Sequence, residues 1–301
     1  MNKKKTIKTI FLVLFFLLIG SIALGMWGAV AFLDKVEKVE INKDNLDANK
    51  EVSKDIINLA LFGIDKEGGQ GRSDSIMILT IDEIHNKLKL TSIMRDSYVE
   101  ISGRNGKDKI NHAYAFGGPE LAIKTLNNNF GLNIKDFIAV NMDSLPVIID
   151  KLGGVDIKVE DDELGLIEGI DSNGVHNLTG KQALDYARIR YTDGGDSRRT
   201  FRQRNILNSI FEKLKFTSID EYPGLISEIL PYIQTSLNNK DMLSLVTKFA
   251  ELIPSGLEQQ RFPRDKDMKN ITINGIYYLD FDNSTVRSEI ESYIFEDKLE
   301  K

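Results

Sequence analysis

Apolar residues fill one unbroken stretch near the start of the chain, from Thr9 to Phe32, which has 24 residues and no charge. A helix needs about 20 apolar residues to cross the hydrocarbon core of a bilayer. All charges before the stretch are positive, and positive flanks favour the cytoplasmic side. The pattern predicts a cytoplasmic tail at residues 1–8, a transmembrane signal anchor at residues 9–32, and an extracellular location for the rest.

A cleaved signal peptide is the alternative to this anchor. Ala29-Val30-Ala31 has the small-x-small pattern that signal peptidases accept. The apolar region of a secretory signal usually has only about 7–15 residues. The length of the stretch therefore favours an uncleaved anchor.

Polar residues dominate the next segment, residues 33–54, which is rich in Lys, Glu, Asp and Asn. This composition predicts a solvated linker between the membrane and the folded part. From Asp55 onward, no low-complexity stretch or internal repeat interrupts the sequence. We therefore expect one extracellular domain at residues 55–301.

Strand patterns open this domain. Ile56–Phe62 is a short, nearly continuous apolar run, as expected for a buried strand. Ser75–Ile81 and Lys87–Ile93 flank the polar turn Asp82–Asn86, which predicts a hairpin. Further strands are predicted at Phe137–Asn141, Val155–Val159, Gln259–Phe262 and Ile276–Phe281.

Helical patterns alternate with these strands. Pro119 is expected to open a helix that runs to Phe130, because Gly131 then occupies the position after the helix that glycine favours. Further helices are predicted at Ser144–Leu152, Thr179–Ala187, Thr200–Lys215, Tyr222–Ile233, Asp241–Leu252 and from about Ser284. Strands interleaved with helices predict an α/β fold with a mixed sheet.

The composition excludes several chemistries. The chain of 301 residues has no cysteine, which rules out disulfides, a cysteine nucleophile, thiolate zinc sites and iron–sulfur clusters. Its three histidines have no metal-ligand spacing, and no common hydrolase, nucleotide-binding or zinc-protease motif is present. The formal net charge is −6, and it falls to −10 once the four lysines of the cytoplasmic tail are set aside.

Arginines are concentrated against this acidic background. Six of the 12 arginines fall within residues 188–204, where only Asp193 and Asp196 oppose them, so the local charge is +4. Arginine suits phosphate oxygens better than lysine does. Arg199 and Gln203 share one helix face with apolar residues, and Arg188 and Arg190 share one side of an extended segment. A solvated basic helix is the alternative, but the pattern favours a ligand with an anionic head and an apolar tail.

Aspartates gather near the start of the domain. Asp65 directly follows the first strand, and Asp74 precedes the second, across a loop that contains Gly68, Gly69 and Gly71. Two carboxylates at neighbouring strand ends can bind a hard cation such as Mg²⁺. Arg95-Asp96 closes the third strand and adds another arginine and carboxylate. Ordinary turn chemistry is the alternative for each aspartate taken alone.

Seven sequence blocks, taken in order, resemble the LytR-CpsA-Psr proteins of the bacterial cell envelope. They are LFGID (Leu61–Asp65), GRSD (Gly71–Asp74), SIMRD (Ser92–Asp96), KINHAYAFGG (Lys109–Gly118), DKLGGVDIKV (Asp150–Val159), LTGKQALDYARIR (Leu178–Arg190) and GGDSRRTFRQRNIL (Gly194–Leu207). Their combination is far more specific than any single block.

The resemblance implies a membrane-anchored phosphotransferase outside the cytoplasmic membrane. Such enzymes move an anionic glycopolymer, of the wall teichoic acid or capsular polysaccharide type, from undecaprenyl pyrophosphate onto peptidoglycan. The implied fold is a central mixed β-sheet with helices on both faces and an apolar pocket for the polyprenyl tail. The implied cofactor is Mg²⁺, with Mn²⁺ as the alternative. Nucleic acid is not expected as a partner, because the basic segment lies on the extracellular side.

Roles for individual residues follow from the same resemblance. Asp65 and Asp74 resemble the metal-binding carboxylates, with Asp196 as a third candidate. The residues that resemble pyrophosphate ligands are Arg72, Arg95, Arg188, Arg190, Arg199 and Gln203. Of all these, Asp74, Arg95 and Arg199 are the candidate catalytic residues.

Two positions depart from the family pattern. Met94 stands where proline is usual, and Phe137 where tyrosine is common. Neither supplies a polar catalytic group, so we expect altered loop rigidity or packing with activity retained.

Two other functions fit the same residues. One is a non-catalytic envelope protein that binds anionic polymer or lipid-linked sugar, and the other is a polyprenyl-pyrophosphate hydrolase. Binding alone would not require a pair of metal-binding aspartates beside the arginines, which favours an enzyme.

Overall fold

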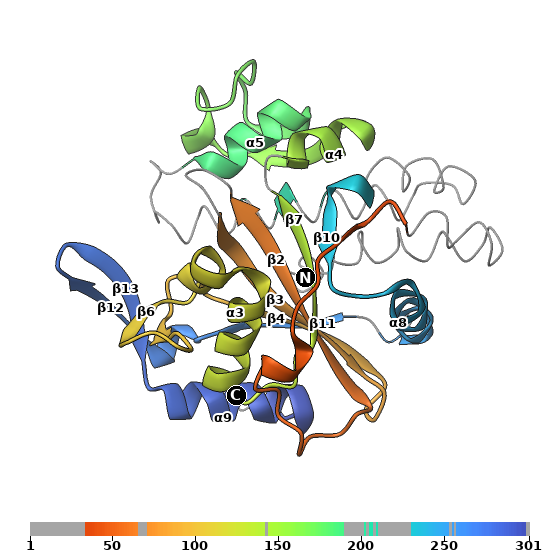
Figure 1. Ribbon diagram of the computed structural model, residues 1–301. Coiled ribbons are helices and arrows are strands. Elements are labelled where there is room, and N and C mark those ends of the chain that lie inside the picture. Colours follow the sequence, from red (N-terminus) through yellow and green to blue (C-terminus); the bar gives the residue numbers. More distant parts are fainter. Residues whose placement is uncertain are drawn as a thin grey trace. The chain divides into compact units, whose positions relative to one another are not determined.

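The computed structural model describes residues 34–65, 71–141, 144–189, 202, 205–206, 209, 230–252, 255 and 257–298 (Figure 1). The chain divides into two compact units. The first, here called the sheet unit, comprises Val36–Met142 and Ile233–Lys301. The second, here called the α4–α5 unit, comprises Met1–Lys35 and Asp143–Tyr232. We describe each unit by itself.

A seven-stranded mixed sheet forms the centre of the sheet unit, in the order β1-β10-β7-β2-β3-β4-β11. Its strands are β1 (Glu37–Lys38), β2 (Ile56–Asp65), β3 (Arg72–Asp82), β4 (Lys87–Ile93), β7 (Asp136–Asn141), β10 (Ile233–Thr235) and β11 (Leu257–Phe262). β3 runs antiparallel to β2 and β4, whereas β7 pairs with β2, and β11 with β4, in parallel. The expected mixed sheet is thus confirmed.

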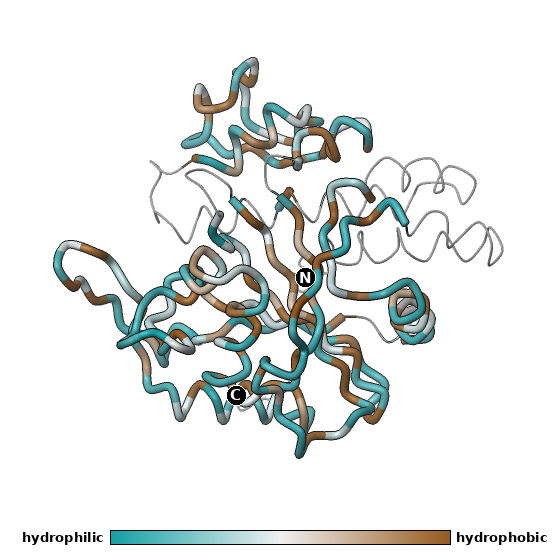
Figure 2. The backbone as a smooth tube through the Cα atoms, in the orientation of Figure 1, coloured by the Kyte–Doolittle hydropathy of each residue, from teal (hydrophilic) through white to brown (hydrophobic). Residues whose placement is uncertain are grey.

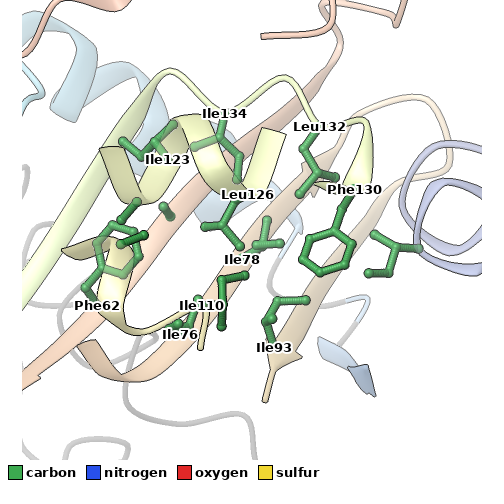
Figure 3. Packing of buried hydrophobic residues seen from close by; sticks show 14 of the residues in the cluster. Phe62, Ile76, Ile78, Ile93, Ile110, Ile123, Leu126, Phe130, Leu132 and Ile134 are labelled. Carbon is green, nitrogen blue, oxygen red and sulfur yellow. The ribbon is translucent and has the colours of Figure 1, made fainter. Parts of the chain in front are cut away.

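Helices α3 (His112–Phe130) and α9 (Asn283–Phe295) cover one face of this sheet. Every second residue of the central strands, such as Phe62, Ile76 and Ile78, packs with side chains of these helices (Figure 3). Burial of each large apolar side chain stabilises the fold by about 1.5–3 kcal/mol. This packing fixes where the strand ends lie.

Helix α3 is made of two pieces. Gly117 and Gly118 leave the helical conformation, with φ −151° and 64°, and Pro119 then starts the longer piece. Proline suits a first helical turn, and Gly131 ends the helix in the left-handed region at φ 66°, as the sequence predicts. The short piece from His112 was not predicted.

Helix α8 (Asn239–Leu252) lies on the other face of the sheet, where Leu59, Leu79 and Leu88 point. The hydropathy tube shows these central strands as largely apolar between α3 and α8 (Figure 2). Met242 and Leu245 bury the apolar side of α8. Helices therefore cover both faces, as expected for this fold class.

Two small hairpins, absent from the predicted elements except for β13, complete the sheet unit. They are β5 (Tyr98–Glu100) with β6 (Lys107–Lys109), and β12 (Met268–Ile273) with β13 (Ile276–Phe281). Both lie on the side of α3 away from α8 (Figure 1). Met94 leaves β4 toward them, and its N–H donates to the Phe262 carbonyl at 3.0 Å. Proline at this position would lack that donor.

The structure differs from the sequence prediction in two segments. Part of the expected linker is folded, because β1 pairs with β10 and Leu46 is wholly buried in the core. Its polar composition hides these few apolar anchors. The predicted helix over Tyr222–Ile233 is wrong at its end, where a 3-10 turn (Leu230–Tyr232) leads into β10. There Thr235 donates its hydroxyl to the Phe137 carbonyl. The pairing of β10 with β7 overrides the helical pattern.

The α4–α5 unit contains α4 (Leu145–Lys151), the hairpin β8 (Val155–Val159) and β9 (Gly174–Leu178), and α5 (Gly180–Arg188). Thr179 caps α5, since its side chain accepts from the Gln182 N–H and the Gln182 side chain accepts from the Thr179 N–H. Gly180 touches the Pro146 carbonyl so closely that no Cβ would fit. This contact packs α4 on α5.

Within the described residues, every helix is too short or too polar to cross a membrane. The predicted anchor at residues 9–32 lies outside those residues, as does most of the predicted helix over Thr200–Lys215.

Candidate functional site

A β-bulge positions Asp74. Gly63 pairs with Ser75 and Ile64 pairs with Ser73, so Asp74 is the extra residue of a bulge in β3. Bulges of this kind redirect a side chain and are frequent beside active sites. Asp65, the last residue of β2, pairs with Arg72 at the start of β3. The two predicted metal carboxylates therefore lie at the same end of the same strand pair.

Arg95 connects Asp74 to a second carboxylate. Its Nη1 lies 2.8 Å from Asp74 Oδ2, and its Nε lies 3.5 Å from Asp96 Oδ2. Lys109, at the end of β6, places its Nζ 2.6 Å from Asp96 Oδ1. Two carboxylates and two cations thus alternate along one chain of contacts.

Backbone hydrogen bonds hold the loop that carries Arg95 and Asp96. The Asn111 N–H donates to the Arg95 carbonyl at 3.2 Å, and the Leu279 N–H donates to the Asp96 carbonyl at 2.9 Å. The Ile110 N–H donates to the Ser97 carbonyl at 2.9 Å. Because these donors come from two separate hairpin regions, the loop is fixed on both sides.

Asn111 belongs to this group of side chains. Asparagine just before a helix usually caps it, but the Asn111 side chain makes no cap hydrogen bond to α3. Its Nδ2 instead lies 3.3 Å from Asp74 Oδ1. Its Oδ1 is buried and has no hydrogen-bond partner among the described residues. We call Asp74, Arg95, Asp96, Lys109 and Asn111 the Asp74 cluster.

The Asp74 cluster is partly open to solvent. The side chains of Asp74, Arg95 and Lys109 are each 18% exposed, whereas Asp96 is 8% exposed. Arg72, two residues before Asp74 on β3, is exposed. Charges at such depth interact more strongly than in bulk water and still reach a ligand. The arrangement suits an anion that contacts Arg95 and Arg72.

Asp65 and Asp74, at this end of β2 and β3, could hold a magnesium ion if phosphate oxygens completed its coordination. Magnesium prefers oxygen and is usually held by one or two carboxylates together with phosphate oxygens. The described residues contain no group of three or more acidic or histidine side chains able to hold a metal. Asp65, Asp74 and the buried Asn111 Oδ1 supply the oxygens that are present. Arg95 shares Asp74 with any such ion.

The predicted site residues fall into three groups. Asp65, Arg72, Asp74 and Arg95 all lie in the sheet unit, and the structure brings Asp74 and Arg95 into contact. Arg188 is exposed in the last turn of α5, in the α4–α5 unit. The remaining predicted residues, Arg190, Asp196, Arg199 and Gln203, lie outside the described residues.

One arginine of the basic segment has a structural role. Arg202 is fully buried, and its Nε lies 2.6 Å from Glu163 Oε1. Its Nη1 also donates to the Ile189 carbonyl at 3.1 Å. The local charge of +4 therefore overstates what this segment can offer a ligand, because Glu163 neutralises one of its six arginines.

Asn111 and Lys109 are not among the predicted site residues, and Asp96 is named beside Arg95 without an assigned role. Lys109 and Asn111 fall inside the KINHAYAFGG block, so the resemblance marked their region without giving them a role. A polar residue before a helix is normally assigned to capping. Only the three-dimensional contact with Asp74 separates Asn111 from that assignment.

The chain is similar in sequence to one known protein family and to named relatives. The model of the LytR_cpsA_psr family matches residues 29–292. A protein of Oceanobacillus iheyensis and one of Bacillus anthracis are each 34% identical; both are named polyisoprenyl-teichoic acid–peptidoglycan teichoic acid transferase TagU. The first alignment covers 95% of this chain and 93% of the relative, and the second covers 79% and 78%.

A solved structure shares the fold. It is described as the LytR-CPS2A-psr family protein YwtF (TagT) with bound octaprenyl pyrophosphate lipid. Its sequence is 25% identical, its TM-score is 0.59, and the match covers 82% of this chain and 95% of that one.

Proposed function

The chain belongs to the LytR-CpsA-Psr family, and from this membership and the Asp74 cluster we propose that it is a magnesium-dependent phosphotransferase. It attaches an anionic glycopolymer, of the wall teichoic acid or capsular polysaccharide type, to peptidoglycan. The donor is undecaprenyl pyrophosphate that carries the polymer. The relatives named for teichoic acid transfer support the reaction class, and the relative with bound octaprenyl pyrophosphate supports the lipid.

The observation that carries this proposal is the contact between Asp74 and Arg95 at the β-bulge. A bulge costs pairing energy, and here the extra residue is a half-buried carboxylate next to a guanidinium. Transfer at phosphorus depends mainly on positioning and on charge neutralisation. The strand ends supply both requirements.

The proposed reaction forms one P–O bond and breaks one, with one proton transferred between oxygens. A peptidoglycan hydroxyl attacks the sugar-proximal phosphorus, its proton leaves to a nearby carboxylate, and undecaprenyl phosphate departs. Arg95 and Arg72 bind the nonbridging oxygens of the pyrophosphate and orient it. Asp65 and Asp74 would hold the magnesium ion, which lowers the negative charge on the phosphate oxygens. Asp196, Arg188, Arg190, Arg199 and Gln203 remain predicted ligands from the family motifs.

We further propose that the catalytic domain acts outside the cell, held by the single anchor at residues 9–32 with its N-terminus in the cytoplasm. The apolar stretch and the lysines before it support this orientation. Undecaprenyl-linked polymer and peptidoglycan meet on that side of the membrane.

The test uses the full chain in detergent with Mg²⁺, a labelled polyprenyl-pyrophosphate polymer and peptidoglycan. Covalent label on peptidoglycan together with an equal amount of polyprenyl monophosphate is the expected result. Monophosphate release without labelled peptidoglycan would identify a hydrolase instead. Bound donor without any release, under conditions where a known transferase works, would identify the non-catalytic binding protein. A chelator is expected to stop transfer, and added Mg²⁺ or Mn²⁺ to restore it.

A further inference from the structure

Two hairpins meet beside the loop that carries Arg95 and Asp96. Ser97, immediately before β5, forms a parallel bridge with Leu279 of β13, and the Leu279 N–H donates to the Asp96 carbonyl. Figure 1 shows β12 and β13 beside β6, on the same side of α3. The β12–β13 hairpin therefore adjoins the loop that carries Arg95 and Asp96.

Three tyrosines lie where these hairpins meet, and we call Tyr98, Tyr277 and Tyr278 the tyrosine platform. The rings of Tyr98 and Tyr278 have centroids 4.7 Å apart and a tilt of 54°. Tyr277 is 40% exposed, and its hydroxyl donates to Asn270 Oδ1 at 2.9 Å. Tyr278 is only 9% exposed, so the aromatic surface that the platform offers to a ligand is mainly the ring of Tyr277.

Two lysines lie over these rings. Lys109 Nζ is 5.9 Å from the ring centroid of Tyr277 and 5.7 Å from that of Tyr278, and Lys107 Nζ is 5.7 Å from that of Tyr98. Such ammonium–aromatic contacts are favourable, and they hold the cations at the platform. Because Lys109 also contacts Asp96 Oδ1, it links the platform directly to the Asp74 cluster.

We propose that the tyrosine platform binds the glycan strand of peptidoglycan and leads its acceptor hydroxyl toward Asp74; this inference rests on the proposed function. Aromatic side chains stack on the apolar faces of sugar rings, and hydroxyl groups at their edges bond sugar hydroxyls. Peptidoglycan offers a continuous row of such rings.

A polyol phosphate donor fits this surface less well. Its chain offers phosphates without a continuous row of ring faces, so it would call for exposed cations and not for an exposed tyrosine ring. The cations here are already held on aromatic rings and, for Lys109, on Asp96. Chemistry and continuity with the site both favour the acceptor.

Insertion into a bilayer is the other use for an exposed hairpin, and the tip argues against it. Ile273 and Ile276 are exposed there, but the turn between them is Asn274-Gly275, with φ 53° and 80°. Burial of this turn in lipid would strip water from a polar side chain and from backbone groups that the turn leaves exposed. Lys269 and Asn270 on β12 are exposed as well.

The first experiment measures binding without any donor. Full chain in detergent is sedimented with peptidoglycan sacculi stripped of teichoic acid and protein. Tyr277→Ala is expected to raise the dissociation constant about tenfold, and Tyr277→Phe to stay within about twofold, since the ring does the stacking. Ile84→Ala is the matched control, because Ile84 is 49% exposed in the turn between β3 and β4.

Because this readout needs no transfer, it separates the two proposals. If the chain binds sacculi through Tyr277 but does not transfer polymer, the platform proposal stands and the proposed function is rejected. The platform is overturned if the intact chain does not bind sacculi, or if Tyr277→Ala binds as well as Ile84→Ala. It is also overturned if Tyr277→Ala loses affinity for purified teichoic acid and keeps it for sacculi.

The second experiment uses the absence of cysteine. Ile276→Cys creates the only thiol of the chain, so an environment-sensitive dye can be attached at the hairpin tip alone. In proteoliposomes the dye is expected to show emission typical of water and to shift when soluble peptidoglycan fragments are added. Emission typical of lipid before any glycan is present would assign the hairpin to the membrane and reject the proposal.

Discussion

Strands β3 and β4 carry a group of charges at each end, and the two groups differ in how completely they are satisfied. At the turn end, Asp82, Lys89 and Asp297 form what we call the Lys89 cluster. Lys89 and Asp82 are fully buried, and Lys89 Nζ lies 2.8 Å from Asp82 Oδ2. The same Nζ donates to the carbonyls of Tyr293 and Ile294 at 3.0 and 3.2 Å.

At the opposite end, the Asp74 cluster keeps contact with solvent and leaves a buried oxygen of Asn111 without a described partner. The Lys89 cluster joins the C-terminal end of α9 to the sheet, where a cation is favoured by the helix dipole. A closed network of this kind stabilises structure. A charged ligand requires an open network, in which some hydrogen-bonding groups remain available to it.

Removal of Lys89 should break the closed end and cause the largest loss of stability. In Lys89→Met, Asp82 loses its buried partner, so we expect the free energy of unfolding to fall by about 3–5 kcal/mol. Denaturant unfolding measures this. Lys87→Met is the control, expected to cost about 0–1 kcal/mol because Lys87 is 32% exposed. Equal losses in both variants would contradict the structural role of Lys89.

Removal of Asp74 should lower transfer activity more than stability, whereas removal of Lys89 lowers stability. Asp74→Ala is expected to lower transfer by 10²- to 10³-fold, about 2.7–4 kcal/mol in the barrier, because a preorganised group at the reacting phosphate is lost. Its unfolding free energy should fall less than in Lys89→Met, because Arg95 keeps Asp96 as a partner and both side chains at the Asp74 contact reach solvent. Transfer rate and denaturant unfolding are measured on the same preparation. Full activity would remove Asp74 from the site.

Truncation of Asn111 should lower the transfer rate less than removal of Asp74 does. In Asn111→Ala, Asp74 loses one hydrogen bond, so we expect about a tenfold lower transfer rate, about 1.4 kcal/mol. The N-terminus of α3 should keep its stability, because Asn111 does not cap it. Circular dichroism and the transfer assay check both parts. A loss of helix stability without a loss of rate would return Asn111 to a capping role.

Acid should weaken the stabilising contribution of the Lys89 cluster, and this effect should be the smallest of those predicted. Burial, the largest single influence, raises the pKa of Asp82, but hydrogen bonds from Lys89 and His85 together hold that pKa below its ordinary 3.8. A lowered folded pKa gives stability that is present above pH 3.8 and is lost as pH falls through the folded pKa. Unfolding free energy should therefore decline below about pH 4, less steeply in Asp82→Asn. Identical slopes would contradict this.

The central elements could be predicted because their patterns are local. Lys87–Ile93 and Ile276–Phe281 have the predicted bounds of β4 and β13, and Gly131 ends α3 as expected. Short strands such as β1 and β10 could not be predicted, since their two or three residues gain stability only from distant partners.

The residues that meet at Asp74 could be predicted only in part. Asp74 and Arg95 stand in recognisable blocks, so the sequence alone marks them. Asn111 becomes part of the site only through a contact across 37 positions of the chain. Arg202 shows the converse, because its place among five other arginines suggests ligand binding, whereas it is buried against Glu163. Composition describes charge, and only the fold shows which charges are already paired.

The most direct test of the central claim, that the open Asp74 cluster binds a polyprenyl pyrophosphate with magnesium, is a calorimetric titration. Full chain in detergent is titrated with polyprenyl pyrophosphate in the presence of Mg²⁺. We predict binding of one lipid per chain, weakened at least about tenfold by Asp74→Ala or by removal of Mg²⁺, and unchanged by Lys87→Met. Equal affinity in Asp74→Ala and the intact chain, with and without Mg²⁺, would contradict the account.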